Sequence, residues 1–184
     1  MVRINWEGWF ISCTEIYYFS GTGNSLYIAQ ELQKKIPDAK LIPIVSLLQQ
    51  EIIHTKGKRV GFIFPVYALT IPIPVKRFLK KLDISYAEYV FAVATRLGIV
   101  FKGFKRIDKI LKKKNSGLNS HFVLNMYSND VKVEDYQSPN EAEISKLEII
   151  VQNKLDQIIS IILNQVASKE KDFDFLIRLP LYWF

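Results

Sequence analysis

Short apolar runs alternate with segments of helical periodicity along most of the chain. The runs are rich in β-branched and aromatic residues, and this pattern predicts strands that are buried on both faces. They are Ile16–Phe19, Leu41–Leu48, Val60–Val66, Tyr89–Thr95 and His121–Met126. Between and after them, apolar residues recur at spacings of three and four, which predicts helices. These helices are Leu26–Lys34, Val75–Leu82, Phe101–Lys114 and a long one from Pro139 to about Ala167.

Strands that alternate with helices indicate a parallel sheet covered on both faces. Five strands joined by right-handed crossovers predict an α/β fold, a three-layer, doubly wound parallel five-stranded sheet. No internal repeat or low-complexity linker divides the chain, so we expect one domain over residues 14–170. Residues 1–13 form an N-terminal extension and residues 171–184 a C-terminal tail.

Composition agrees with one globular domain. The chain has 184 residues, of which 49% are hydrophobic and 23% charged, enough for a sizeable core. No stretch of about 18 uncharged apolar residues is present, and the N-terminus lacks a signal-peptide pattern, so we expect a cytoplasmic protein and no membrane partner. The single cysteine, Cys13, excludes a disulfide within the chain and a four-thiolate metal site. His54 and His121 have no other ligand-type residue at metal-binding spacing.

The net charge of +7 comes from 25 Lys and Arg against 18 Asp and Glu. A basic balance favours acidic partners or phosphates, although a solvated surface explains it more simply. Many of the cations decorate the predicted helix Phe101–Lys114, whose aromatic and aliphatic residues face the core. No base-stacking motif accompanies them, so we expect no nucleic-acid partner. An alternative is a docking surface for an acidic redox partner such as a ferredoxin, centred on Lys112–Lys114.

A glycine- and hydroxyl-rich loop separates the first strand from the first helix. It reads Ser20, Gly21, Thr22, Gly23, Asn24 and Ser25. At a helix N-terminus the first backbone N–H groups lack partners and the macrodipole favours an anion. Glycines let the backbone curl around a phosphate, while the hydroxyls and the amide add donors. The simpler alternative, a tight turn with one capping hydroxyl, does not need three hydroxyls in six residues.

Other nucleotide-binding motifs fit this loop less well. No Lys follows Gly23, which disfavours the P-loop of nucleotide hydrolases. Leu26 stands where the third glycine of the dinucleotide-binding fingerprint belongs. The residues therefore favour a monophosphate held by hydroxyl and amide groups without a cationic side chain.

The segment Ile16–Ser25 resembles the start of flavodoxin-like domains, whose phosphate loop reads Ser/Thr-x-Thr-Gly-x-Ser/Thr. The chain is most similar to the flavodoxin half of flavodoxin–ferredoxin fusion proteins, and the likeness extends to Gly61–Tyr67 and Ile71–Leu79. It covers roughly Glu15 to Met126. The resemblance implies strand order 2-1-3-4-5, FMN as cofactor, and a redox partner such as a ferredoxin or ferredoxin domain. It also implies a following ferredoxin segment with Cys-x-x-Cys-x-x-Cys motifs, which this sequence lacks. Residues 171–184 are then either a linker towards such a domain or the tail of a single-domain relative.

In a doubly wound sheet the ligand lies beyond the carboxyl ends of the strands. We therefore expect two further loops beside the phosphate loop: Pro65, Val66, Tyr67, Ala68 and Leu69 after the third strand, and Thr95, Arg96, Leu97 and Gly98 after the fourth. Tyr67 is the expected stacking partner of the flavin ring. Asn125, Tyr127, Asn129 and Asp130 follow the fifth strand and are expected to border the same cleft.

Both ring loops depart from the family pattern. Relatives often carry an aromatic residue and a Trp where this chain has Ala68–Thr70, and a small, Gly-rich loop where it has Arg96 and Leu97. A positive charge from Arg96 near the ring would stabilise reduced flavin. We therefore expect weaker flavin binding than in these relatives.

Three functions follow as alternatives. The first is an FMN-binding electron-transfer protein, in which no side chain need act as an acid or base and no residue is catalytic. The second is an NAD(P)H-dependent FMN or quinone reductase. The third is a flavodoxin-fold module that has lost its flavin. Fold alone does not choose among them.

Overall fold

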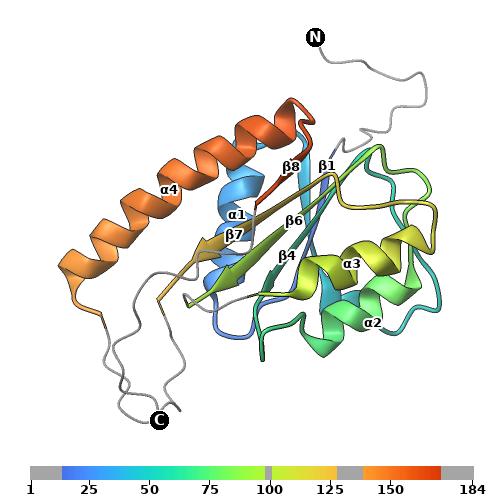
Figure 1. Ribbon diagram of the computed structural model, residues 1–184, viewed down its shortest axis with the longest axis horizontal. Coiled ribbons are helices and arrows are strands. Elements are labelled where there is room, and N and C mark those ends of the chain that lie inside the picture. Colours follow the sequence, from blue (N-terminus) through green and yellow to red (C-terminus); the bar gives the residue numbers. More distant parts are fainter. Residues whose placement is uncertain (1–13, 98–100, 128–138, 171–184) are drawn as a thin grey trace.

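The computed structural model describes residues 14–97, 101–127 and 139–170. The predicted N-terminal extension, the C-terminal tail and the site residue Gly98 lie outside the described residues, as do Asn129 and Asp130. The described chain forms a parallel sheet with helices on both faces, which confirms the predicted α/β class (Figure 1). Among the described residues, no helix is long and apolar enough to cross a membrane.

The sheet has six strands in the order β2-β1-β4-β6-β7-β8. They are β1 (Thr14–Tyr18), β2 (Ala39–Pro43), β4 (Arg59–Pro65), β6 (Tyr89–Arg96), β7 (Ser120–Asn125) and β8 (Ser168–Lys169). The five predicted strands fill the first five places, and every pairing is parallel. The predicted count of five is wrong, because β8 adds a sixth strand beside β7. Its two residues carry no apolar alternation, so no sequence pattern marked it.

Two other short strands lie apart from the main sheet. β3 (Ile53–His54) pairs with β5 (Leu82–Asp83) in a two-stranded parallel sheet. The predicted strand Leu41–Leu48 is also corrected, because β2 ends at Pro43 and residues Ile44–Leu47 form the 3-10 helix η1. A continuous apolar run does not reveal where a strand gives way to a helical turn, and Pro43 has no N–H with which to continue the ladder.

The helices cover the sheet in pairs. Helices α2 (Ile73–Lys81) and α3 (Gly103–Lys112) lie on one face, and α1 (Asn24–Lys35) and α4 (Glu141–Leu163) lie on the other (Figure 1). Each pair encloses its own apolar core. Tyr17, Phe62 and Phe78 belong to the first core, and Ile16, Phe91 and Leu155 to the second. Adjacent strand residues thus serve opposite layers, as expected when side chains alternate between the faces of a sheet.

Helix α4 has two dissimilar halves. Its start is closed by a capping box, in which the Asn140 side chain accepts from the Glu143 N–H and the Glu143 carboxylate accepts from the Asn140 N–H. The predicted apolar stripe is buried from Val151 to Ile162. Ile144, at the start of that stripe, is 48% exposed. The helix therefore packs on the sheet mainly through its second half, and Leu147 is the partly buried contact of its first half.

A buried carboxylate organises the amino end of the sheet. The Glu15 carboxylate, on β1, accepts from the Tyr17 hydroxyl at 2.8 Å and from the Lys56 N–H at 3.0 Å. Burial, together with the adjacent Glu15 charge, raises the pKa of Tyr17 above its usual range. The phenol therefore stays protonated and donates its hydrogen bond to Glu15. This pair fixes the loop that leads into β4.

Candidate functional site

The three loops predicted to form the site follow β1, β4 and β6, which are neighbours in the sheet. Direct hydrogen bonds join them near their strand ends. The Phe19 N–H donates to the Ile63 carbonyl at 2.9 Å, and the Val66 N–H donates to the Thr95 carbonyl at 2.8 Å. The structure therefore brings the loops together at the carboxyl edge of the sheet, where ligands bind in open α/β folds.

The phosphate loop Ser20–Ser25 runs into the first turn of α1, whose N-cap residue is Gly23. Gly23 has φ of 104°, a conformation that favours glycine, and it supplies no side-chain cap. The first turn of α1 contains no acidic residue. The Ser20 hydroxyl accepts from the Gly23 N–H at 3.1 Å, which shapes the loop from within. Residues 21–23 are exposed, so the positive end of α1 faces solvent and suits an anion.

Two residues of the loop tie it to neighbouring strands. The Ser25 hydroxyl is buried and lies 2.7 Å from the Thr95 hydroxyl on β6. The Asn24 amide donates to the Tyr127 carbonyl, just after β7, at 2.8 Å. Ser25 therefore faces into the protein, while Ser20 and Thr22 lie nearer the solvent side of the loop. The sequence does not distinguish these orientations, because all three residues are small hydroxyl or polar types.

Tyr67 lies against the phosphate loop. A Cβ atom placed on Gly21 would come within 2.2 Å of the Tyr67 hydroxyl. The Tyr67 ring also meets Phe19 edge-on, with ring centroids 6.3 Å apart and planes at 87°. Tyr67 itself is 43% exposed. The ring thus borders the loop on one side and solvent on the other, and only glycine at position 21 leaves room for this arrangement.

The chain reverses directly after Tyr67 in a tight turn. The Tyr67 N–H and carbonyl both bond to Thr70, and the two residues between them have positive φ: 46° for Ala68 and 61° for Leu69. Such turns normally use Asn or Gly, and each non-glycine residue in this conformation costs about 1–2 kcal/mol. Helix α3 holds the turn, because the Lys102 N–H donates to the Leu69 carbonyl and the Arg106 guanidinium donates to the Thr70 hydroxyl. The sequence carries no signal for this turn.

The loop after β6 places Arg96 and Leu97 at the same edge. The Arg96 side chain donates through Nε to the Asn125 side-chain carbonyl at 3.0 Å. Leu97 is 56% exposed. Leu69, Tyr67 and Tyr127 are also substantially exposed. The carboxyl edge therefore combines an anion-binding type of loop with exposed apolar side chains and the positive charge of Arg96.

This set of groups suits binding better than acid–base catalysis. Pro65, Val66 and Thr95 supply backbone and packing at the strand ends, and the loop supplies hydroxyl and amide donors. Among the described residues, no cluster of His, Cys, Asp and Glu suited to a metal ion occurs. The edge therefore fits a phosphate attached to a flat, largely apolar group, which is the chemistry of FMN.

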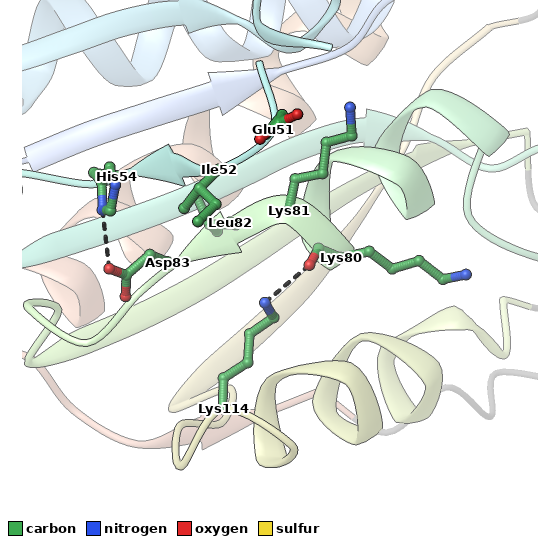
Figure 2. A pocket seen from close by; sticks show the side chains of 8 residues that line it. All are labelled: Glu51, Ile52, His54, Lys80, Lys81, Leu82, Asp83 and Lys114. Atoms are coloured by element: carbon green, nitrogen blue, oxygen red, sulfur yellow. Dashed lines mark hydrogen bonds and ion pairs between the residues drawn. The ribbon is translucent and has the colours of Figure 1, made fainter. Parts of the chain in front are cut away.

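A separate hollow of about 370 Å³ lies at the opposite end of α2, lined by residues of β3, β5 and both adjoining helix ends (Figure 2). His54 Nδ1 and the Asp83 carboxylate form a hydrogen bond of 2.9 Å in it. Two of its lysines donate hydrogen bonds to backbone carbonyls. Lys81 donates to the carbonyls of Leu48 and Gln50, and Lys114 donates to the carbonyl of Lys80. The hollow is thus bounded by hydrogen bonds that close helix ends, and it is remote from the phosphate loop.

No family model and no curated protein matches the chain. Solved structures match its fold. Smu.1420 from Streptococcus mutans UA159 matches with a TM-score of 0.51 and 14% identity, covering 79% of this chain and 97% of that one. An FMN-dependent NADH-azoreductase from Bacillus anthracis str. Ames Ancestor, solved with FMN, matches with a TM-score of 0.50 and 8% identity, over 80% and 97%. An azoreductase from Bacillus anthracis str. Sterne matches with a TM-score of 0.50 and 9% identity, covering 83% of this chain and 99% of that one. The chain therefore shares the overall α/β fold of these proteins.

Proposed function

We propose that the protein binds FMN non-covalently at the carboxyl edge of the sheet and carries electrons. The observation that carries this proposal is the loop Ser20–Asn24, which is exposed at residues 21–23 and has Tyr67 against Gly21. The open helix end and the loop donors suit the phosphate, and the adjacent aromatic ring suits the flat isoalloxazine. The match to a structure described as FMN-dependent supports the choice of ligand.

The chain's residues have distinct roles in this proposal. Ser20, Thr22 and the loop N–H groups hold the phosphate, and the Ser25–Thr95 hydroxyl pair keeps α1 in register with β6. Tyr67 and Leu97 flank the ring and exclude water, while Arg96 brings positive charge to the same edge. Bound FMN would supply the electron transfer itself. No side chain is assigned an acid or base role.

We also infer a specific place for the chain within its fold class. The arrangement of the first five strands is the 2-1-3-4-5 order of flavodoxins, with β8 as an addition. Residues 14–170 act as the FMN-binding unit of a cytoplasmic protein, and the relatives with the most similar motifs are the flavodoxin halves of ferredoxin fusions. A ferredoxin or ferredoxin domain is therefore the proposed redox partner.

The second candidate function is an NAD(P)H-dependent FMN or quinone reductase. It is favoured by the likeness to the NADH-azoreductase, a protein named for reduction by a nicotinamide. The two candidates differ in what reduces the flavin. Adding NADPH or NADH to the FMN-loaded protein under anaerobic conditions would bleach its absorbance rapidly only if the protein is a reductase.

Titration of the FMN-free protein with FMN, followed by quenching of flavin fluorescence, tests the binding proposal. We expect saturation at one FMN per chain with micromolar affinity, because both ring loops depart from the flavodoxin pattern. Ser20→Ala should weaken binding roughly tenfold, about 1.4 kcal/mol. Ser145→Ala, on the exposed start of α4, is the matched control and should bind as the wild type does. Absence of saturable binding would reject the proposal, and nanomolar affinity would reject the expected weakening.

A further inference from the structure

The face formed by α2 and α3 is strongly basic. The exposed cations of these helices and their ends are Lys76, Arg77, Lys80, Lys102, Lys105, Arg106, Lys109, Lys112 and Lys113. Within the bounds of the two helices, Asp108 is the one acidic residue, and it pairs with Lys112 at 2.7 Å. In the described part of the chain, Lys112 is the one cation of this set in an ion pair with a carboxylate. The positive charge of this face is therefore largely uncompensated.

Two groups of basic residues mark opposite ends of these helices, and Lys76, Arg77, Lys109 and Lys112 belong to neither group. Helices that follow parallel strands begin at the carboxyl edge of the sheet and run back towards its amino edge. Lys102, Lys105 and Arg106, which we call the near cluster, therefore lie beside the proposed FMN site. Two contacts fix this position: the Lys102 N–H bonds to the Leu69 carbonyl at 3.2 Å, and the Arg106 guanidinium bonds to the Thr70 hydroxyl at 2.9 Å.

The far cluster comprises Lys80, Lys81, Lys113 and Lys114, at the carboxyl ends of α2 and α3. Figure 2 shows Lys80, Lys81 and Lys114 grouped around the hollow that also contains His54 and Asp83. The Lys114 ammonium donates to the Lys80 carbonyl at 2.9 Å, which joins the two helix ends. The sequence-based expectation of docking at Lys112–Lys114 thus falls on the end of α3 that is remote from the site.

Exposed apolar side chains lie at the same edge of the sheet as the near cluster. Tyr67, Leu69 and Leu97 are 43%, 47% and 56% exposed. The turn that carries Leu69 is the one held by Lys102 and Arg106. An apolar centre bordered by charged residues is the usual anatomy of a protein–protein interface, in which the charges set orientation and association rate.

We propose that an acidic redox protein docks on the near cluster, with the exposed apolar residues of the Tyr67–Thr70 turn at the centre of the interface. The far cluster lies outside this interface. The proposal rests on the proposed FMN site, because docking there places the partner's redox centre next to the flavin. In the exchange, one electron leaves the reduced centre of the partner, which is oxidised, and enters the flavin, which is reduced.

The side chains of this face argue against the other polyanions. Single-stranded nucleic acids bind to exposed aromatic rings that stack with bases. The aromatic residues of α2 and α3, Phe78 and Phe104, are 0% and 5% exposed and belong to the core, so Tyr67 is the one exposed ring of these two helices and the Tyr67–Thr70 turn. One ring does not form a stacking platform for successive bases. Binding to an anionic membrane would require apolar residues on the outer face of the helix, yet the exposed positions of α3 are all charged.

Charge reversals at the two ends of the helices separate docking from general electrostatic attraction. The near variant is Lys102→Glu with Lys105→Glu, and the far variant is Lys80→Glu with Lys113→Glu. Both change the net charge equally. The near variant places acids at the start of α3, where the helix dipole favours them, whereas the far variant places acids at helix ends, where it does not. Loss of binding confined to the near variant therefore cannot come from a less stable helix. Arg106 is left intact because it supports the turn.

Binding to an immobilised plant-type [2Fe–2S] ferredoxin of net negative charge, measured at low ionic strength, is the test. We expect the near variant to weaken binding roughly tenfold or more and the far variant about twofold or less. Equal weakening by both variants, or no ferredoxin binding by the wild type, would overturn the proposal. So would phosphatidylserine vesicles or oligothymidine that bind more tightly than ferredoxin and lose binding selectively in the near variant.

FMN titration of the same variants keeps the two proposals distinguishable. We expect both variants to bind FMN with wild-type affinity, because neither changes a residue of the phosphate loop or the ring loops. Binding to ferredoxin is measured without flavin, so a protein that binds ferredoxin at the near cluster but takes up no FMN would refute the FMN site and leave the docking surface standing. The rate of electron transfer from reduced ferredoxin to the FMN-loaded protein should fall in the near variant alone.

Discussion

The two ends of the central sheet treat their polar groups differently. At the amino end, Glu15 binds the Tyr17 hydroxyl and a backbone N–H, and Arg59 donates to the Thr14 hydroxyl at 2.9 Å. The Lys81 and Lys114 side chains there donate to the backbone carbonyls of Leu48, Gln50 and Lys80. At the carboxyl end, the glycine loop is exposed and the start of α1 has no side-chain cap.

We infer from this difference that the amino end of the sheet contributes mainly to stability and the carboxyl end mainly to ligand binding. Polar groups that are satisfied within the chain stabilise one structure and leave little for a ligand to gain. Groups held in place but turned towards solvent are prepared for a ligand, and ligand sites of such sheets lie beyond the carboxyl ends of the strands. We therefore expect substitutions at the amino end to change the free energy of unfolding, and substitutions at the carboxyl end to change affinity.

The largest expected effect is at the amino end. Glu15→Ala removes the acceptor of the buried Tyr17 hydroxyl and of the partly buried Lys56 N–H, and should lower the free energy of unfolding by about 2–4 kcal/mol. Glu51→Ala, at an exposed position, is the control and should change it little. Urea unfolding followed by circular dichroism measures both. A loss below about 1 kcal/mol would show that the pair contributes no more than an exposed one.

At the carboxyl end, Gly21→Ala should reduce FMN affinity about tenfold or more, roughly 1.4 kcal/mol, with little change in stability. The added Cβ would meet the Tyr67 hydroxyl, and Tyr67 is exposed enough to move away. Tyr67→Phe removes that hydroxyl and leaves the ring carbon at an ordinary 3.5 Å. The double variant should therefore bind FMN more tightly than Gly21→Ala alone. If the double variant binds FMN no more tightly, the loss of affinity in Gly21→Ala does not come from the clash with the Tyr67 hydroxyl.

Helix α4 offers a further test of this separation between stability and binding. Like α1 it follows the carboxyl end of a strand, but its N-terminal N–H groups are capped by its own side chains. Asn140→Ala removes the acceptor of the Glu143 N–H and should lower the free energy of unfolding by about 1 kcal/mol. FMN affinity should not change. A loss of affinity in this variant would contradict the separation of the two kinds of helix start.

The smallest expected effect is a dependence of stability on alkaline pH. The folded-state pKa of Tyr17 is raised, above all by burial. Its contribution is fully present below about pH 10, the pKa of the unfolded chain, and decreases as the pH rises above it. Thermal unfolding between pH 9 and pH 11 should therefore show a smaller fall in Tyr17→Phe than in the wild type. Equal falls would assign the dependence to other groups.

Sequence patterns predicted the parts of this fold that depend on composition and spacing. Buried runs such as Val60–Val66 identified the central strands, and the Ser20–Ser25 motif identified the loop at the start of α1. Local spacing also separated the buried and solvated sides of α3, where Phe104 and Ile107 face the core as expected.

Features that depend on contacts between distant residues were not predictable. Strand β8 has only two residues and forms because the chain after α4 returns beside β7. The left-handed turn at Ala68 and Leu69 uses residues that do not favour it, and it is held by bonds from α3. The contact of Tyr67 with Gly21 and the pairing of Ser25 with Thr95 likewise join segments far apart in the sequence.

The unequal burial of α4 has a consequence for its motions. Residues Glu141–Ile150 contain no buried side chain, whereas Val151, Leu155, Ile158, Ile159 and Ile162 belong to the core. Amide protons in the first half should exchange with solvent through local fraying, within the limits set by the capping box. Those in the second half should exchange only when the sheet layer itself opens. The two halves of one continuous helix would then differ in the rate at which their amide protons exchange.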